Sequence, residues 1–234
     1  MTGPAVPGRH DEPAVVPAHV EAGGPALHWR RGDLQLSKMS VSSQDNNAYL
    51  LTDAVSGDQL LIDAADDAPR LLELLHACHP HGRLTAVVTT HRHWDHHRAL
   101  TEVVAATGAD VLAGAPDAGE LPTRATRRLV HQDVVDLGSH RFEVIALRGH
   151  TRGSIALAWR DPQGVTWLFT GDSLFPGGVG KTRSQEDFEQ LLADVTARVF
   201  DMHPDSTLVH PGHGDSTILG TQRPQLPAWR ERGW

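Results

Sequence analysis

The chain has 234 residues, a formal net charge of −8 and 39% hydrophobic residues, which suits one large α/β domain better than two small ones. The acidic charge offers a phosphate backbone no basic surface, so nucleic acid is disfavoured as a partner. Cys78 is the only cysteine, and no segment approaches the ~20 apolar residues that span a bilayer. We therefore expect a cytoplasmic protein without nucleic-acid or membrane partners; its oligomeric state is left open.

Residues 1–26 hold five prolines and four glycines, which predicts an irregular N-terminal arm before a single domain over residues 27–234. Short apolar runs separated by turn residues follow at 34–41, 47–53 and 59–64. This pattern predicts antiparallel strands joined by hairpins. The next segment, 66–79, has Pro69 in its first turn and an apolar face, which predicts a helix. That face consists of Leu71, Leu72, Leu75 and Cys78.

Strands and helices alternate in the rest of the chain. Residues 84–90 are predicted to form a buried strand and 94–107 one continuous helix. Ser184, with Asp187 three residues later, begins a second helix that should run to residue 200. The further strand candidates are 110–114, 141–147, 154–160, 165–170 and 206–214, and residues 223–234 form a short tail. Groups of strands with helices between them predict mixed sheets covered by outer helices.

The segment THRHWDHH, at the end of the buried strand, carries a cluster of ligand-type side chains. His91 and His93 are two residues apart in an extended segment, so both side chains leave the same face of the chain. Asp95 and His96 follow where the chain turns toward a helix, so they approach from another direction. Imidazoles and carboxylates are the common nitrogen and oxygen ligands of transition metals. The segment therefore predicts a metal site.

Three later loops each place one ligand-type residue after a predicted strand. They are His150 in RGHTRGS, Asp172 in LFTGDSLF and His213 in LVHPGHGD. Functional sites of α/β proteins are commonly built from such loops. With four motifs in this order, the chain resembles the metallo-β-lactamase superfamily from about residue 34 to 217. Within that superfamily it most resembles the glyoxalase II-like hydrolases.

The resemblance implies an α/β fold, a four-layer αββα sandwich of mixed sheets and outer helices, with a metal site at one edge. It also implies two divalent metal ions, with zinc as first choice and iron or manganese as alternatives, since imidazole and carboxylate serve all three. The implied ligands are His91, His93 and His150 for the first ion, Asp95, His96 and His213 for the second, and Asp172 as a bridge. Asp63 matches a strand-end aspartate that orients a ligand.

The implied activity is hydrolysis of a thioester or related acyl substrate by a hydroxide that the two ions share. Asp95 and Asp172 would act in catalysis because their charges partly offset those of the metals. Lys181, in GDSLFPGGVGK, matches a lysine that contacts the carboxylate end of a glutathione thioester. The chain departs from glyoxalase II at two points. Arg183 replaces an aromatic residue, and only 21 residues follow His213, where glyoxalase II has a helical C-terminal domain.

Other branches of the superfamily are the alternatives. Persulfide dioxygenases share the motif order but hold one iron with two histidines and the bridging aspartate, and their next segment resembles GCGRTD more than GGVGKTR. They rank second. Lactonases place a tyrosine soon after the bridging aspartate, whereas the only tyrosine here is Tyr49. The tRNA-processing nucleases match only in the metal motifs, and the acidic charge does not favour them.

Overall fold

The first sheet of the computed structural model, which describes residues 19–233, comes from the N-terminal half of the chain. Its strands, in spatial order, are β1 (Leu27–Arg31), β2 (Leu34–Ser40), β3 (Asn47–Asp53), β4 (Asp58–Ile62), β5 (Arg83–Thr89), β6 (Asp110–Gly114) and β7 (Arg127–Leu129). β1 to β4 are antiparallel, as the hairpin pattern predicts, and β4 to β7 are parallel. Parallel neighbours need crossover connections, and helices α1 (Ala68–Cys78) and α2 (Leu100–Thr107) supply two of them.

The second sheet follows in the C-terminal half. Its strands are β8 (Val134–Leu137), β9 (His140–Ala146), β10 (Ile155–Arg160), β11 (Thr166–Gly171), β14 (Leu208–Pro211) and β15 (Thr217–Ile218), in the spatial order β15-β14-β11-β10-β9-β8. Helix α3 (Gln185–Val195) and the π-helical turn Thr196–Phe200 connect the parallel strands β11 and β14. A separate small hairpin, β12 (Leu174–Phe175) and β13 (Gly178–Val179), precedes α3.

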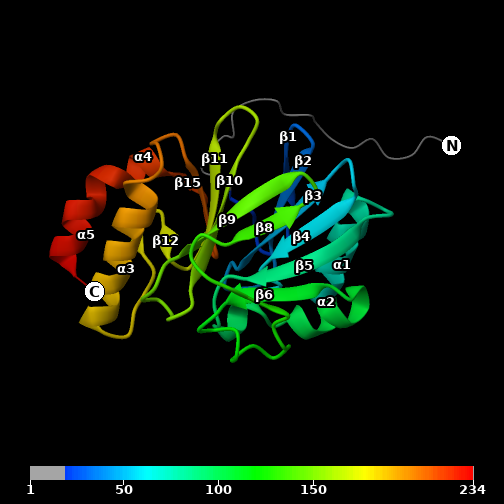
Figure 1. Ribbon diagram of the computed structural model, residues 1–234, viewed down its shortest axis with the longest axis horizontal. Helices are drawn as coiled ribbons and strands as arrows, with labels where there is room; N and C mark the ends of the chain where they lie inside the picture. The colour runs from blue at the N-terminus through cyan, green and yellow to red at the C-terminus, as the bar shows by residue number, and fades with distance from the viewer. Residues whose placement is uncertain (1–18, 234) are drawn as a thin grey trace.

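The two sheets face each other, with helices outside both. Figure 1 shows α1 and α2 against the first sheet and α3 with α5 (Leu226–Arg232) against the second. Side chains alternate between the faces of each strand. Leu51 therefore packs between the sheets, whereas its neighbour Leu50 packs toward α1. Phe188 and Leu191 of α3 belong to a third apolar cluster, with residues of the second sheet. The predicted αββα sandwich is confirmed.

The prediction of one continuous helix over 94–107 is wrong. Residues 94–96 form a 3₁₀ turn, and α2 begins only at residue 100. Between them, the amides of Arg98 and Ala99 donate to carbonyl oxygens of the loop after β4, at 3.2 and 3.0 Å. These bonds replace the helical pattern, so the chain changes direction here. The break fixes the ligand-bearing segment to the end of a neighbouring strand.

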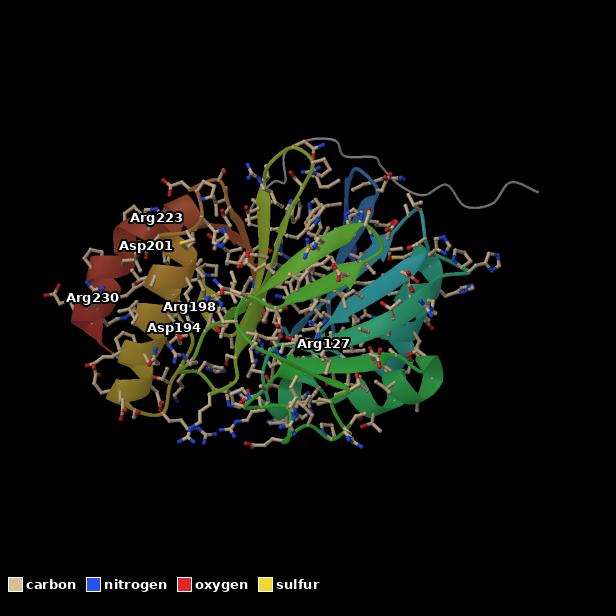
Figure 2. The ribbon with its side chains drawn as sticks, viewed as in Figure 1. Arg127, Asp194, Arg198, Asp201, Arg223 and Arg230 are labelled. Atoms are coloured by element: carbon tan, nitrogen blue, oxygen red, sulfur yellow. The ribbon has the colours of Figure 1, made fainter. Side chains whose placement is uncertain are left out.

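Helix α3 begins as predicted, with the Ser184 hydroxyl oxygen accepting from the amide of Asp187 at 3.1 Å. Near its other end, Figure 2 shows Asp194 and Arg198 side by side, and their charged groups are 3.6 Å apart. Asp194 also accepts two hydrogen bonds from the Arg148 guanidinium, each 2.8 Å, and one from the Arg148 amide at 3.0 Å. The helix thereby holds the loop after β9, which carries one of the predicted ligands.

The segment 223–234 was expected to be a short tail, but residues 226–232 form α5, after a short helix α4 (Leu219–Gln222) and a 3₁₀ turn. Pro224 and Pro227 lie in first turns, where proline sacrifices no helical hydrogen bond. Trp229 is buried and packs edge-on against Phe200, with ring centres 6.1 Å apart. The tail thus completes the outer layer.

Most of the predicted N-terminal arm, residues 1–18, lies outside the described residues. Residues 19–26 contain no helix or strand, and Val20 among them is buried. The carbonyl oxygen of Gly24 accepts a hydrogen bond of 2.6 Å from the Arg70 side chain on α1. Within the described part of the chain, every helix is too short or too polar to cross a membrane.

Candidate metal centre

The ligand-type side chains singled out in the sequence converge at one edge of the sandwich. They follow the ends of β5, β9, β11 and β14. Their ligand atoms form three overlapping groups, within each of which all atoms lie within 4.8 Å of one another: His91–His93–His150, His91–His96–Asp172 and Asp95–His96–His213. We call the first of these the histidine trio and the third the mixed trio.

The histidine trio presents three imidazole nitrogens to one point. His91 Nε2 lies 3.1 Å from His93 Nδ1 and 3.2 Å from His150 Nε2. The other ring nitrogens have acceptors: His150 Nδ1 donates to the Lys181 carbonyl at 2.6 Å, and His91 Nδ1 faces the Thr90 hydroxyl at 3.1 Å. Burial lowers the pKa of His91 well below its ordinary value and that of His93 to about 4. The trio is therefore neutral, with Nε2 of His91 and His150 and Nδ1 of His93 directed inward.

The mixed trio has the same inner arrangement but carries a carboxylate. His96 Nε2 and His213 Nε2 are 3.2 Å apart, and Asp95 Oδ2 lies 3.4 Å from His213 Nε2. On the outer side, His96 Nδ1 donates to Asp63 at 2.9 Å and His213 Nδ1 to the Gln44 carbonyl at 2.9 Å. Burial alone would lower the pKa of both histidines. The surrounding carboxylates outweigh it and raise each pKa to about 10, so these rings attract positive charge.

Asp172 lies between the two trios. Its carboxylate oxygens are 3.4 Å from His96 Nε2, 3.6 Å from His150 Nε2 and 3.5 Å from His213 Nε2. Burial alone would raise the pKa of Asp172, but the imidazoles of His213 and His96 hold it well below its ordinary range. Its buried Oδ1 atom accepts no hydrogen bond from the described residues. An ionised, incompletely paired carboxylate in this place calls for a cation.

The arrangement fits divalent metal ions. Tetrahedral zinc with Zn–N bonds of about 2.0–2.1 Å separates its nitrogen ligands by about 3.3 Å, close to the 3.1–3.2 Å observed within both trios. Unprotonated imidazole nitrogens at that distance repel each other unless a cation lies between them. Each trio would hold one ion, and Asp172 reaches both. Nitrogen and carboxylate donors suit zinc, iron and manganese alike.

Asp63 orients the mixed trio from behind. Its Oδ1 accepts from the Thr90 amide at 2.7 Å, and its Oδ2 accepts from the Thr90 hydroxyl at 2.8 Å and from His96. Asp63 has a left-handed backbone conformation, with φ of 58°, which turns the chain sharply at the end of β4. These contacts fix the ring orientation of His96. Orienting a ligand is the role that the resemblance to the superfamily implies for Asp63.

Several polar residues outside the predicted ligand motifs also support the centre. Asn46 Nδ2 donates to Asp95 Oδ2 at 3.1 Å. The loop 211–214 is held by three buried side chains: Lys38 donates to the Gly214 carbonyl at 2.6 Å, and Asn47 and Tyr49 donate to the Pro211 carbonyl at 3.0 and 2.7 Å. Lysine and asparagine within apolar strands are expensive to bury without such partners. Their presence within apolar strands was therefore the sequence signal that these polar side chains have buried partners.

Lys181 is not among the converging side chains. Its carbonyl accepts a hydrogen bond from His150, and Lys181 also lines a neighbouring cavity of about 240 Å³. That cavity is also lined by Val179, Gly180, Phe188, Arg232 and Gly233. The centre itself is open to solvent on one side, because the side chains of Asp95, Asp172 and His213 keep 18%, 14% and 24% of their surface exposed.

Comparison with known sequences agrees with this geometry. Residues 41–217 match the profile of the Metallo-beta-lactamase superfamily, which covers most of the chain and all four ligand-bearing segments. The chain belongs to this superfamily.

Three relatives illustrate the similarity. A hydroxyacylglutathione hydrolase of Fuscovulum blasticum is 40% identical over 173 residues, which are 73% of this chain and 63% of that protein. The crystal structure of ETHE1 from Myxococcus xanthus is 30% identical with a TM-score of 0.72, covering 82% of this chain and 83% of that one. TTHA1623, solved in a di-iron-bound form, is 28% identical with a TM-score of 0.64, covering 80% and 96%.

The matched length is limited on the side of the relatives. The chain spans only 63% of the Fuscovulum blasticum hydrolase and 62% of a second hydroxyacylglutathione hydrolase, from Jannaschia sp.. The remainder of those proteins has no counterpart in the match.

Proposed function

We propose that the protein is a dinuclear metal-dependent hydrolase that cleaves a thioester with an anionic thiol part, in the manner of a hydroxyacylglutathione hydrolase. The observation that carries the proposal is the position of Asp172, 3.4–3.6 Å from nitrogens of both trios. The names of relatives at 34–40% identity support the reaction class. The di-iron form of TTHA1623 supports a two-metal centre on this fold. We take zinc as the first candidate and iron as the second.

Two divalent cations bound here would provide a water of lowered pKa and polarise the thioester carbonyl. The protein's own part is to direct Nε2 of His96, His150 and His213 toward the metal positions, which it does by occupying Nδ1 of each ring with an outer acceptor. Asp95 and Asp172 offset part of the positive charge. Asp95 also borders solvent and receives a hydrogen bond from Asn46, and contact with His213 holds its pKa below the ordinary range, so it is an ionised carboxylate.

The substrate class is argued from the cavity beside His150. Lys181 and Arg232 both line it, together with the apolar side chains of Val179 and Phe188. The peptide carbonyl of Lys181 accepts a hydrogen bond from His150, so one residue of the cavity wall also contacts the histidine trio. Two cationic side chains near an apolar wall favour an anionic tail on a partly apolar chain. Arg232 comes from α5, in the segment that was expected to be a short tail.

Metal content and two assays together test the proposal. The full chain, purified without added metal, should contain two ions and release free thiol from a hydroxyacyl thioester of glutathione. The alternative reaction, oxidation of a persulfide by a single iron, would give one iron per chain and oxygen uptake with a glutathione persulfide. That second pattern would overturn the hydrolase proposal.

A further inference from the structure

A second buried carboxylate, Asp117, joins the two segments that carry the histidine trio. It follows β6 and is fully buried. Its Oδ2 accepts from the Arg92 amide at 3.0 Å and from the Thr151 hydroxyl at 2.5 Å, and its Oδ1 accepts from the Gly153 amide at 2.9 Å. Arg92 stands between His91 and His93, and Thr151 follows His150. One carboxylate thus binds the neighbours of all three histidines.

The surroundings of Asp117 leave little room for adjustment. A Cβ atom on Gly153 would lie 2.6 Å from the carboxyl carbon of Asp117, and one on Gly114 would lie 2.0 Å from the Gly153 carbonyl oxygen. The Thr151 hydroxyl also contacts the Ser154 hydroxyl at 2.7 Å. Three loops are therefore packed backbone to backbone around the carboxylate, so the contacts that hold it also fix the distance between the loops.

We propose that Asp117 is a positioning residue for the metal position formed by His91, His93 and His150, and that it acts on this position alone. The inference rests on the proposed two-metal centre. No hydrogen bond or ion pair described in the structure joins Asp117 to Asp95, His96 or His213. The mixed trio has its own carboxylate, Asp63, at 2.9 Å from His96. Asp117 therefore supports the histidine trio, whereas Asp63 contacts His96 of the mixed trio directly and the histidine trio only through Thr90.

The expected effect follows from hydrogen-bond chemistry. Asp117→Asn keeps the size of the side chain but turns one of its two acceptor atoms into a donor, which would then face an N–H or O–H group. At least one of the three hydrogen bonds must break, and the segments carrying His91 and His150 can move apart. Loss of a residue that orients metal ligands typically weakens metal affinity about 10–100-fold.

A control for general destabilisation is available within the same fold. Asp161 is also buried, and it accepts hydrogen bonds from the Gln163 amide (2.9 Å), the Val165 amide (2.8 Å) and Trp167 Nε1 (3.1 Å). These partners belong to β11 and the turn before it, and Arg31 at the end of β1 pairs with Asp161 at 3.6 Å, so none lies in a ligand-bearing loop. Asp161→Asn should lower the melting temperature as Asp117→Asn does, but leave metal affinity within about twofold of the original, because no ligand segment contacts it.

The experiment is a titration of the metal-free full chain with Zn²⁺ in competition with a chromophoric chelator. We expect the original chain and Asp161→Asn to bind two ions alike, and Asp117→Asn to bind one ion normally and the other at least about tenfold more weakly. Equal affinities in Asp117→Asn and Asp161→Asn would overturn the proposal. A single ion in the original chain would contradict the two-metal centre instead, while the difference between the two variants would still decide the role of Asp117.

Thr151 provides a second test should Asp117→Asn fail to fold. Thr151→Ser retains the hydroxyl that donates to Asp117, whereas Thr151→Val removes it with little change in shape. The weaker metal binding should appear in Thr151→Val and be absent in Thr151→Ser. Identical metal affinities in these two variants would count against the proposal, because the contact with Asp117 would then have no bearing on the metal.

Discussion

His210 and His213 are three residues apart in one segment, yet the fold gives them opposite preferences for a proton. His210 is stacked on Trp167 at 5.3 Å between ring centres and on Phe169 at 5.4 Å, and burial lowers its pKa to about 3. His213 faces Asp95 and Asp172, which raise its pKa to about 10.

The difference shows that burial alone does not make a histidine a ligand. His210 lies in an aromatic core, where its Nδ1 contacts the Ser216 hydroxyl at 2.9 Å and its Nε2 has no hydrogen-bond partner among the described residues. His213 has an acceptor behind it and carboxylates in front. Carboxylates that attract a proton also attract a metal ion, so the same electrostatic field marks the metal centre.

The largest expected effect is that of Asp172→Ala. This change removes the carboxylate that lies between the trios, so both metal positions lose a ligand and the charge that balances the ions. We expect hydrolytic activity to be abolished and the metal content to fall below that of the unaltered chain. Activity assays and elemental analysis of the purified variant measure both.

His97→Ala is the matched control for the metal centre. His97 is adjacent to His96 and nearly as buried, but its Nε2 lies 3.0 Å from the Arg92 carbonyl, and His97 belongs to none of the three groups of ligand atoms. Metal content should stay nearly unchanged. Equal metal loss in His97→Ala and Asp172→Ala would mean that the ligands are wrongly assigned.

The buried His210, stacked on aromatic rings, predicts a loss of stability in acid. His210 is neutral in the folded state down to pH about 3, whereas an unfolded histidine takes up a proton near pH 6.5. The unfolded state therefore binds more protons below pH 6.5, and the contribution of His210 to the free energy of unfolding should fall by about 1.4 kcal/mol per pH unit between 6.5 and 3. Urea unfolding at pH 7 and pH 4.5 measures this slope.

His210→Phe isolates that contribution from other groups that titrate in acid. Phenylalanine retains the stacking but has no proton to bind, so the variant should lose less stability than the original chain between pH 7 and 4.5. Identical pH slopes in the two proteins would show that His210 is not the group responsible. Lys38, the charged neighbour that lowers its pKa further, is unchanged in both.

A smaller effect is expected from Lys181→Ala, because its side chain lies outside the trios. An anion held in the neighbouring cavity interacts with Lys181 similarly in the ground and transition states, so KM should rise with kcat nearly constant. A lost charged hydrogen bond of about 1.5–3 kcal/mol corresponds to about a 10- to 100-fold fall in kcat/KM.

Two controls accompany that experiment: a neutral substrate, and the replacement of an arginine outside the cavity. A neutral thioester should be hydrolysed equally by Lys181→Ala and the original chain. Arg230→Ala removes an exposed arginine of α5, labelled in Figure 2, that does not line the cavity, and it should leave both substrates unaffected. If anionic and neutral thioesters lose the same activity in Lys181→Ala, the lysine does not bind the substrate tail.

Tyr49→Phe should have the smallest effect. It removes the hydrogen bond of 2.7 Å to the Pro211 carbonyl but keeps the ring contacts with Phe169 and His210. We expect a loss of about 1 kcal/mol in the free energy of unfolding, together with the original pH slope. Chemical denaturation at pH 7 would detect it, and a loss of several kcal/mol would indicate that the 211–214 loop depends on this one bond.

Local patterns predicted most of the elements of this fold, and the errors have physical causes. Residues 94–107 contain no proline or glycine, so a helix over this range looked continuous. Only the amides of Arg98 and Ala99, bonded to a distant loop, show the break. The helix around Trp229 was missed because two prolines suggest a loop, although both occupy first turns.

The candidate site likewise contains residues that motifs predict and residues that they do not. The converging side chains of the centre follow strand ends and could be listed from motifs. Asp117 could not, because its partners lie 25 residues before it and 34 to 36 residues after it, and a lone aspartate after a strand is ordinary in turns. Likewise, the left-handed conformation of Asp63 is a property of the folded backbone that no pattern of residue types announces.

The break between residues 96 and 100 also bears on how the molecule opens locally. Helix α2 is only eight residues long and ends at Gly108, so its last turn should fray readily and its amides exchange with solvent fast. The amides of Arg98 and Ala99 donate instead to carbonyl oxygens in the loop after β4, a strand paired on both sides. Unwinding of the helix therefore need not reach Asp95 and His96. These residues can keep their positions while the helix that follows them is unfolded.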